Sequence, residues 1–164
     1  MEKRKKLNTT LALIMDKDNV LLGQKKRGFA KGTFNGIGGK QDPGETIDEA
    51  MIRETQEEIG VTPTHPKLVG NIDFVNINYK GERVDINLHV YLCDGYEGEI
   101  QETEEMIPYW FNKNHLPLDQ MLPDDKLWFP LVFEKDFIQG KIIYDNDMNR
   151  TSFAIDTSAN EKIQ

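Results

Sequence analysis

The sequence contains little cysteine and little histidine. Its 164 residues include one cysteine, Cys93, so no disulfide can form within the chain, and three histidines whose spacing fits no zinc site. No run of apolar residues approaches the ~18 that a membrane span requires. Basic side chains are also in the minority, because 20 Lys and Arg against 28 Asp and Glu give a net charge of -8. This charge argues against a surface that coats DNA or RNA.

The remaining composition is that of a globular protein, with 38% hydrophobic and 29% charged residues. The length suits one domain, and no repeat or linker divides it. We therefore predict a single domain over 1–164, with a basic tail at 1–8 and a polar tail at 156–164. The basic start is followed by an apolar run too short for a secretory leader. We expect a cytoplasmic monomer with no membrane or nucleic-acid polymer as partner.

Strands are indicated by alternating apolar and polar residues. The clearest run spans 84–92, and the segment 72–79 is expected to pair with it through Lys80-Gly81. Two further apolar runs, 11–15 and 20–24, flank a turn composition and predict a second hairpin. One short strand is expected at 152–155.

Two helices are predicted. The first begins with a capping box, in which Thr46 is the N-cap and Glu49 is the third helical residue, and it ends at Gly60. The second is expected between Asp124 and Gly140, with Pro130 near its beginning. Strands of this kind with two helices predict an α+β protein whose helices cover both sides of a central mixed sheet.

The first predicted helix gathers three carboxylates, Glu54, Glu57 and Glu58, within little more than one turn. Arg53 can reach Glu57 four residues on, but one guanidinium does not neutralise three carboxylates. A hard divalent cation such as Mg²⁺ would, since it prefers oxygen ligands and accepts substrate phosphates in its shell. Glutamate-rich helices are commonly only solvated faces, so the carboxylates alone leave both interpretations open.

A glycine-dense loop over 35–45 precedes this helix and would let the backbone approach a ligand closely. Together, loop and helix read Gly39-x5-Glu45-x7-Arg53-Glu54-Thr55-x-Glu57-Glu58-x-Gly60-Val61. This pattern resembles the signature of the Nudix (MutT-like) hydrolases. Thr55 departs from it, because the family usually has an aliphatic residue there, which is a packing difference.

The resemblance implies an α/β/α sandwich whose loop–helix–loop binds Mg²⁺ or Mn²⁺ and hydrolyses a nucleoside diphosphate linked to another group. It implies metal binding by three carboxylates and a carbonyl, with loop support from three further residues: Glu54, Glu57, Glu58 and Gly38 for the metal, and Arg53, Glu45 and Gly39 for support. The expected catalytic groups are Arg53, Glu57, Glu58 and Glu105. Which of the three glutamates takes the proton from water stays open.

Four segments, 21–29, 34–40, 106–111 and 123–130, further resemble the animal oxidised-purine nucleoside triphosphatases within this family. That resemblance implies a pocket of eight residues. Asn35, Asp124 and Asp125 would hydrogen-bond the purine edge, Phe29, Phe74 and Trp128 would form apolar walls, and Thr10 and Lys25 would line the remainder.

Independent chemistry agrees with such a pocket, because two adjacent carboxylates do not both ionise cheaply and one can stay protonated and donate. The alternatives are ordinary: Asp124 and Asp125 as helix caps after Pro123, and the aromatic residues as core. Leu122 stands where the animal enzymes have a second tryptophan, which leaves the exact base in question.

Three functions are therefore compared. The first is a Mg²⁺-dependent diphosphatase that converts oxidised purine nucleoside triphosphates, 8-oxo-dGTP and also 2-hydroxy-dATP, to monophosphates and pyrophosphate. The second is the same chemistry on a nucleotide sugar or dinucleotide. The third is a nucleotide-binding module without catalysis, which the complete carboxylate set disfavours.

Overall fold

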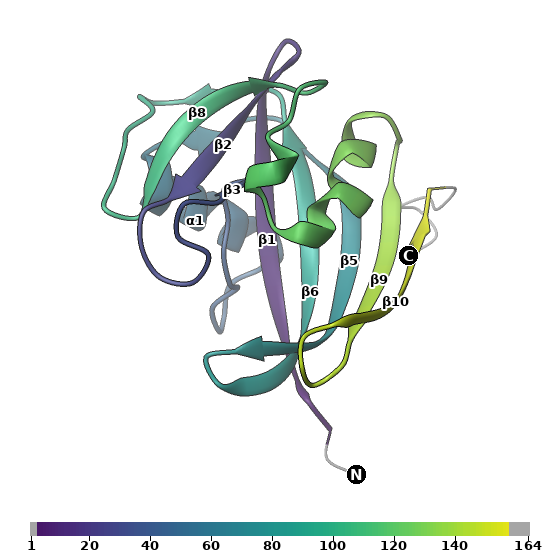
Figure 1. Ribbon diagram of the computed structural model, residues 1–164. Coiled ribbons are helices and arrows are strands. Elements are labelled where there is room, and N and C mark those ends of the chain that lie inside the picture. Colours follow the sequence, from purple (N-terminus) through teal and green to yellow (C-terminus); the bar gives the residue numbers. More distant parts are fainter. Residues whose placement is uncertain (1–2, 158–164) are drawn as a thin grey trace.

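The computed structural model describes residues 3–157, in which a long mixed sheet carries one α-helix and three short 3₁₀ helices (Figure 1). The elements in chain order are β1 (Lys5–Asp16), β2 (Asn19–Lys25), β3 (Phe34–Asn35), α1 (Ile47–Ile59), β4 (Thr62–Pro63), β5 (Pro66–Tyr79), β6 (Glu82–Cys93), β7 (Tyr96–Glu97), β8 (Met106–Asn112), η1 (Leu118–Gln120), η2 (Pro123–Leu127), η3 (Phe129–Phe133), β9 (Ile138–Tyr144) and β10 (Arg150–Asp156).

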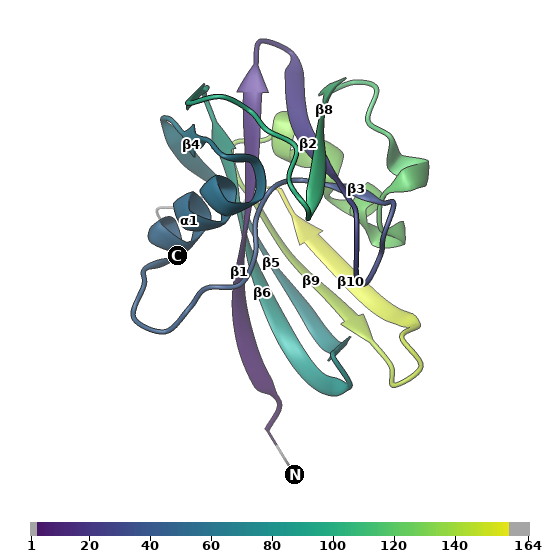
Figure 2. The ribbon, with the colours of Figure 1, turned by 90° about the vertical axis from the view of Figure 1, so that its left-hand side faces the viewer.

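The strands run in the order β10-β9-β5-β6-β1-β2-β3, and β8 pairs with β2. β1 lies parallel to β6 and β9 lies parallel to β5, whereas the β5–β6 and β9–β10 pairs are antiparallel. β1 and β2 pair only beside their connecting turn, so β2, β3 and β8 diverge from the other five strands of the sheet. α1 lies on one face and the 3₁₀ helices lie towards the other (Figure 2). The mixed central sheet of an α+β protein is confirmed.

The prediction for α1 is confirmed at both ends. Thr46 accepts a hydrogen bond from the backbone N–H of Glu49, the Glu49 side chain accepts one from Thr46, and Gly60 ends the helix with a left-handed φ of 79°. Tyr91 on β6 donates a hydrogen bond to Asp48 in the first turn. The cap therefore sets where the helix begins, and the bond from the sheet fixes its position.

The second predicted helix is wrong. Between Asp124 and Gly140 the chain forms η2 and η3 and then enters β9. Pro130 has no N–H and its ring conflicts with an α-helical carbonyl four residues earlier, and Trp128 departs from helical geometry with φ −134°. Beyond the turns, buried Ile138, Gly140 and Ile142 alternate with exposed residues, which is the period of a strand.

The predicted tails are shorter than expected. β1 begins at Lys5, within the predicted tail 1–8, because Lys5 and the residues after it pair in parallel with β6, and Leu7 is buried. At the other end Asp156 belongs to β10, which confirms and extends the strand expected at 152–155. Of the predicted tails, residues 1–2 and 158–164 lie outside the described residues.

Two buried clusters fill the faces of the sheet. One includes Leu11, Ile72 and Val90, together with Trp128, which lies between η2 and η3, and Phe129 of η3. The other packs against α1 through Met51 and Ile59 and contains Ile14, Tyr91 and Cys93. Over residues 3–157 no helix has the length and apolar character needed to cross a membrane.

Candidate active site

The carboxylate-bearing end of α1 is partly enclosed by protein. Glu58 is only 6% exposed, whereas Glu57 is solvent-exposed. Thr55 is fully buried, and its hydroxyl donates to the carbonyl of Met51 at 2.8 Å, one turn earlier. Thr55 thus fills a core position of the helix with its polar atom satisfied, as expected for a packing difference.

Arg53 joins the glycine-dense loop to the helix. Its guanidinium donates two hydrogen bonds to Glu45, at 3.0 and 2.6 Å, and one to the carbonyl of Lys40 at 3.0 Å. The remaining nitrogen, Nη1, donates to Glu54 at 2.9 Å and to Glu57 at 3.2 Å. These bonds hold the Glu45 pKa at about 2, because Arg53 and the backbone N–H of Asp42 both favour the carboxylate.

Gly39 sits directly under the carboxylate of Glu54. A Cβ on Gly39 would lie 2.5 Å from Cδ and 2.5 Å from Oε2 of Glu54. A Cβ on Gly38 would lie 1.9 Å from the carbonyl oxygen of Thr10, while the backbone N–H of Thr10 donates to the Gly39 carbonyl at 2.9 Å. Both glycines therefore permit close approaches, one to β1 and one to a predicted metal ligand.

Glu58 is the strongly perturbed group of this site. Burial raises its pKa well above the usual range, and the charge and hydrogen bond of Glu54 and the charge of Glu105 add to the shift, while Lys25 opposes it. The hydroxyl of Thr103 donates to the Glu58 carbonyl at 2.8 Å and holds the acidic segment against the helix. Glu54, Glu105 and Lys25 therefore lie near enough to Glu58 to influence its charge.

The chemistry of these donors fits a hard divalent cation. Because Glu58 is buried beside other carboxylates, its protonated form is favoured. A bound cation would replace that proton. Within residues 3–157, no three acidic, histidine or cysteine side chains converge as a ready cation site, since Arg53 engages Glu54 and Glu57. The metal ligands Glu54, Glu57, Glu58 and Gly38 therefore stay a prediction.

The two aspartates of the predicted base pocket lie in η2 in unlike environments. Asp124 is held by Tyr144, whose hydroxyl donates to Oδ2, and by Arg150, whose Nη1 lies 3.5 Å from Oδ1. Asp125 is 5% exposed and accepts a hydrogen bond from the backbone N–H of Leu122 at 3.2 Å. Burial, reinforced by the charge of Asp124, raises the Asp125 pKa to about 7. Asp125 thus also caps its turn.

The aromatic residues predicted as pocket walls differ in position. Trp128 is 1% exposed and packs 5.1 Å from Phe129, and its indole N–H is buried without a hydrogen-bond partner. Phe74 is partly buried against the same cluster. Phe29 is 83% exposed on the loop between β2 and β3, so in this structure it forms no wall. That loop turns through Gly28 and Gly32, both with positive φ.

The two remaining pocket candidates lie on the strands. Asn35 in β3 is half-buried, and its side-chain oxygen accepts from the N–H of Gly36 at 2.8 Å. In the described part of the chain no hydrogen bond joins Asn35 to either aspartate. Thr10 is buried in β1, and its hydroxyl donates to the Gly39 carbonyl at 3.4 Å, so Thr10 supports the loop.

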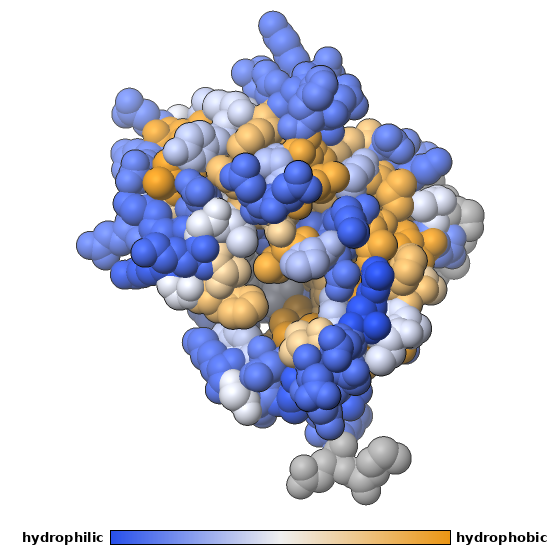
Figure 3. All heavy atoms as spheres, in the orientation of Figure 1, coloured by the Kyte–Doolittle hydropathy of each residue, from blue (hydrophilic) through white to orange (hydrophobic). Residues whose placement is uncertain are grey.

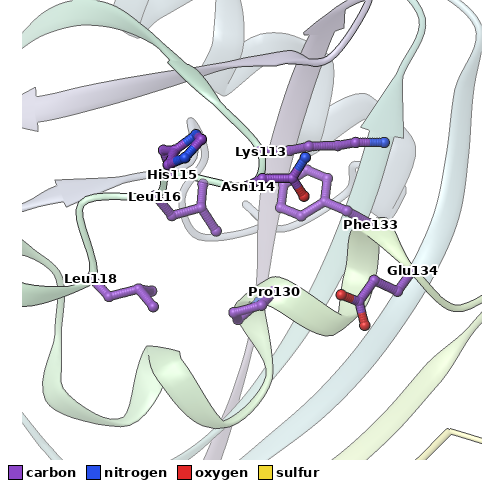
Figure 4. Close-up of a pocket in the computed structure, with 8 residues that line it drawn as sticks. All are labelled: Lys113, Asn114, His115, Leu116, Leu118, Pro130, Phe133 and Glu134. Carbon is purple, nitrogen blue, oxygen red and sulfur yellow. The ribbon is translucent and has the colours of Figure 1, made fainter.

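The face drawn in Figure 1 is hollowed in front of the long strands, below the 3₁₀ helices, and apolar side chains border this hollow (Figure 3). A separate cleft of about 340 Å³ lies between the β8–η1 connection and η3 (Figure 4). The cleft is lined by Lys113, Asn114, His115, Leu116, Leu118, Pro130, Phe133 and Glu134. None of these is a predicted site residue, so the cleft is separate from the chemistry described above.

Sequence reasoning missed two residues of the site, Tyr144 and Arg150. Both follow the segment that was assigned to a helix, and the β9–β10 hairpin places them beside Asp124. The available signal was the alternation of Ile138, Gly140 and Ile142 at every second residue. If this period is continued by two residues, Tyr144 falls on the same inner face of the strand.

Comparisons with known proteins agree with this geometry. The family model described as NUDIX domain matches residues 5–132. The oxidized purine nucleoside triphosphate hydrolase of Danio rerio is 46% identical over 131 residues, 80% of this chain and 82% of that protein. The protein of the same name from Mus musculus is 36% identical, covering 89% of this chain and 92% of that one.

Among solved structures, a MutT protein from Bacillus halodurans superposes with a TM-score of 0.76 at 30% identity, over 92% of this chain and 97% of that one. This match confirms the mixed-sheet sandwich expected from the resemblance. The family model, the relatives and the solved structure all identify the same family that the loop–helix pattern from Gly39 to Gly60 indicated. The chain belongs to the Nudix family of hydrolases.

Proposed function

We propose that this Nudix hydrolase cleaves oxidised purine nucleoside triphosphates to the monophosphate and pyrophosphate. The observation that carries the proposal is the pair Asp124 and Asp125, of which one is ion-paired and the other is buried with a raised pKa. Such a pair offers an acceptor and a donor side by side, which the edge of a purine requires. Relatives that carry the name of this activity match over four-fifths or more of the chain.

Nudix hydrolases generally need a divalent metal, and we infer that Mg²⁺ serves here, with Mn²⁺ as a substitute. Glu54, Glu57 and Glu58 would hold it, together with the carbonyl of Gly38. When bound, the ion would offset the phosphate charge and acidify a water molecule. Arg53 and Glu45 keep the loop and the helix in register for that task.

The proton acceptor is one of Glu57, Glu58 and Glu105. Glu58 is enclosed and favours its protonated form without a cation, while Glu105 is occupied by Arg27 at 3.4 Å. Glu57 also contacts Arg53, at 3.2 Å, but it is solvent-exposed and can face an incoming water. We therefore favour Glu57, the most exposed of the three proposed ligands, as the proton acceptor, and Glu58 as a ligand only.

The purine base of the substrate would lie in the hollow bordered by apolar side chains (Figure 3). The polar edge of the purine would face Asp124 and Asp125, with Asn35 as a further hydrogen-bond partner. The unpaired indole N–H of Trp128 supports a polar ligand nearby, because a buried donor without an acceptor costs about 1–3 kcal/mol. Phe29 and Phe74 would close on the base, and Thr10 and Lys25 would complete the pocket. For the exposed Phe29 this requires its loop to move.

The same chemistry on a nucleotide sugar or a dinucleotide is the second candidate. Leu122 keeps it open, because this aliphatic residue is 36% exposed at a position where the resembling animal enzymes have a tryptophan. An aliphatic side chain covers a base without the geometric preference of an aromatic ring.

A panel of nucleotides assayed with Mg²⁺ tests the proposal. We expect pyrophosphate from 8-oxo-dGTP and 2-hydroxy-dATP with a kcat/KM well above that for dGTP. Turnover of a sugar or dinucleotide substrate alone would replace the first candidate with the second, and binding without turnover would indicate a non-catalytic module.

Glu57→Gln separates chemistry from binding. We expect kcat to fall by about 100-fold or more while purine binding, measured by calorimetry, is retained. Glu97→Gln, an exposed substitution in β7, is the control and should keep the full rate.

We further propose that the protein is a monomer in a reducing cytoplasm, which the single buried thiol of Cys93 suits.

A further inference from the structure

The hydroxyl of Thr103 joins two acidic residues that lie far apart in the sequence. It donates a hydrogen bond to the backbone carbonyl of Glu58 at 2.8 Å, and it accepts one from the backbone N–H of Glu105 at 3.3 Å. Glu58 lies in the last turn of α1, whereas Glu105 directly precedes β8. One side-chain oxygen therefore links the backbone of a predicted metal ligand to that of a predicted catalytic carboxylate.

The acidic segment, residues 102–105, is also held from the side of β2. Lys26, directly after β2, donates through its ammonium group to Oε2 of Glu102 at 2.6 Å and to the carbonyl of Thr103 at 3.0 Å. The backbone N–H of Lys26 donates to the carbonyl of Glu105 at 2.9 Å. The segment is thus bound on one side by Lys26, and the Thr103 hydroxyl binds it to α1 on the other.

We propose that Thr103 is a positioning residue of the active site, which holds Glu105 beside Glu58 so that the two carboxylates act together on the bound cation. The cation is that of the proposed function, on which this inference rests. Thr103 itself would touch neither the cation nor the nucleotide, and it would act through the backbone of Glu105.

The ion pair between Arg27 and Glu105 leaves that carboxylate available. Nη2 of Arg27 lies 3.4 Å from Oε1 of Glu105, and the two side chains are 61% and 57% exposed. An exposed ion pair contributes only about 0–1 kcal/mol, so a divalent cation can displace Arg27. The charge of Glu105 also contributes to the raised pKa of Glu58, so the two carboxylates already influence each other.

The ordinary role for Thr103 would be to cap the end of α1. The last carbonyls of an α-helix have no partner within the helix, and the N–H of Gln101 donates to the carbonyl of Ile59 at 2.9 Å just as Thr103 donates to that of Glu58. The bond from the Glu105 N–H is the additional observation, because capping does not require it. A purely capping role predicts lower stability with an unchanged affinity for Mg²⁺.

Two substitutions of Thr103 separate these roles. Thr103→Val keeps the shape of the side chain and removes the hydroxyl, whereas Thr103→Ser keeps the hydroxyl. By calorimetry without nucleotide, we expect the Kd for Mg²⁺ to rise about fivefold in Thr103→Val and to stay within about twofold in Thr103→Ser. A lowered Tm in Thr103→Val with an unchanged Kd would show a capping role alone and would overturn the inference.

Thr64→Val is the matched control. Thr64 is also partly buried, and its hydroxyl also donates to a backbone carbonyl, that of Asp94 at 3.1 Å. This bond lies beside the small β4–β7 sheet and involves none of the predicted site residues. We therefore expect Thr64→Val to lower the Tm while the Kd for Mg²⁺ stays constant.

Amide hydrogen exchange tests the contact itself in the metal-free protein. We expect the Glu105 N–H to exchange about tenfold faster in Thr103→Val than in the unaltered protein, and Thr103→Ser to restore the slower rate. Equal exchange rates in all three proteins would show that the hydroxyl does not hold Glu105, which overturns the inference.

A double-mutant cycle with Glu105→Gln tests the route of the effect. If Thr103 acts through Glu105, Thr103→Val should weaken Mg²⁺ binding in the unaltered background but not further in Glu105→Gln. Losses that add in full would mean that Thr103 acts independently of Glu105, and the inference would be wrong.

The two proposals fail in different ways. If the variants change the Kd for Mg²⁺ and the Glu105 exchange as expected but the protein hydrolyses no oxidised purine nucleotide, the proposed function is wrong and the role of Thr103 stands. If the protein hydrolyses 8-oxo-dGTP while Thr103→Val keeps the original Kd and the original exchange rate, the inference is wrong and the proposed function stands.

Discussion

Arg53 donates two parallel hydrogen bonds to Glu45, with Nε 3.0 Å from Oε2 and Nη2 2.6 Å from Oε1. A forked guanidinium–carboxylate pair fixes direction as well as distance. Glu45 belongs to the loop before the helix and Arg53 to the middle of α1, so this pair joins the two halves of the Nudix signature. The same guanidinium contacts Glu54 and Glu57, which orients the predicted metal ligands as well.

Glu45→Gln should destabilise the fold at neutral pH but not in strong acid. The folded-state pKa of Glu45 is lowered to about 2 from its usual value of 4.5, so its charge stabilises the fold above pH 4.5, and the contribution is lost as pH falls towards 2. Thermal unfolding between pH 2 and 8 should give a Tm difference between the variant and the unaltered protein that is constant above pH 5 and shrinks below 4.5. A difference that persists at pH 2 would contradict this.

Glu58→Gln should have opposite effects on stability and on catalysis. Because the folded-state pKa of Glu58 is raised, the folded protein binds its proton more tightly than the unfolded chain, and stability falls as pH rises above about 4.5. Without metal, the variant should exceed the unaltered protein at pH 8 by ~2–8 °C in Tm, or ~1–2 kcal/mol, and match it at pH 4.

With Mg²⁺ the order should reverse. Magnesium should raise the Tm of the unaltered protein but not that of Glu58→Gln, and kcat of the variant should fall by about 100-fold or more. An equal response to Mg²⁺ in both proteins would remove Glu58 from the ligand set.

Gly39→Ala should displace a carboxylate without unfolding the chain. The new Cβ would lie 2.5 Å from Cδ of Glu54, at the free end of a flexible side chain, so Glu54 must move aside. We expect Mg²⁺ affinity measured by calorimetry to fall by about tenfold or more. Gly81→Ala is the control, since a Cβ there meets nothing within 4 Å, and its φ of 86° costs about 1–2 kcal/mol of stability without moving a carboxylate.

Asp125→Asn should flatten the pH dependence of substrate recognition. With a pKa of about 7, Asp125 is a donor below neutral pH and loses its proton above it, so kcat/KM for 8-oxo-dGTP should decline as pH rises through 7. An amide keeps a donor at every pH, so the variant should retain activity at pH 8.5. Asp124→Asn, which replaces one acceptor oxygen by a donor amide and removes the ion pair with Arg150, should instead raise KM by about tenfold or more.

The parts of the site that were predictable are those set by local chemistry. The capping box at Thr46 and Glu49 and the left-handed Gly60 determine both ends of α1 from side chains within the helix itself. Given that frame, the helical period places Arg53 one turn from Glu57, and the bond between them forms as expected.

Other features depended on contacts between distant segments. Nothing near Tyr144 in the sequence indicates Asp124, because the contact requires β9 to pair with β5 and the chain to turn through η2 and η3. Trp128 is buried and Phe29 is exposed for the same kind of reason: the first packs in the core cluster, and the second lies on the loop between β2 and β3, outside that cluster.

The order of residues alone determined the chemical inventory: which side chains carry charge, how the carboxylates are spaced along one helix, and where glycine allows close approach. Those properties follow from covalent connectivity and from hydrogen bonds a few residues apart. Only the tertiary structure decided which of two neighbouring aspartates is ion-paired and which is buried, since burial and the approach of Tyr144 and Arg150 are set by strand pairing across the sheet.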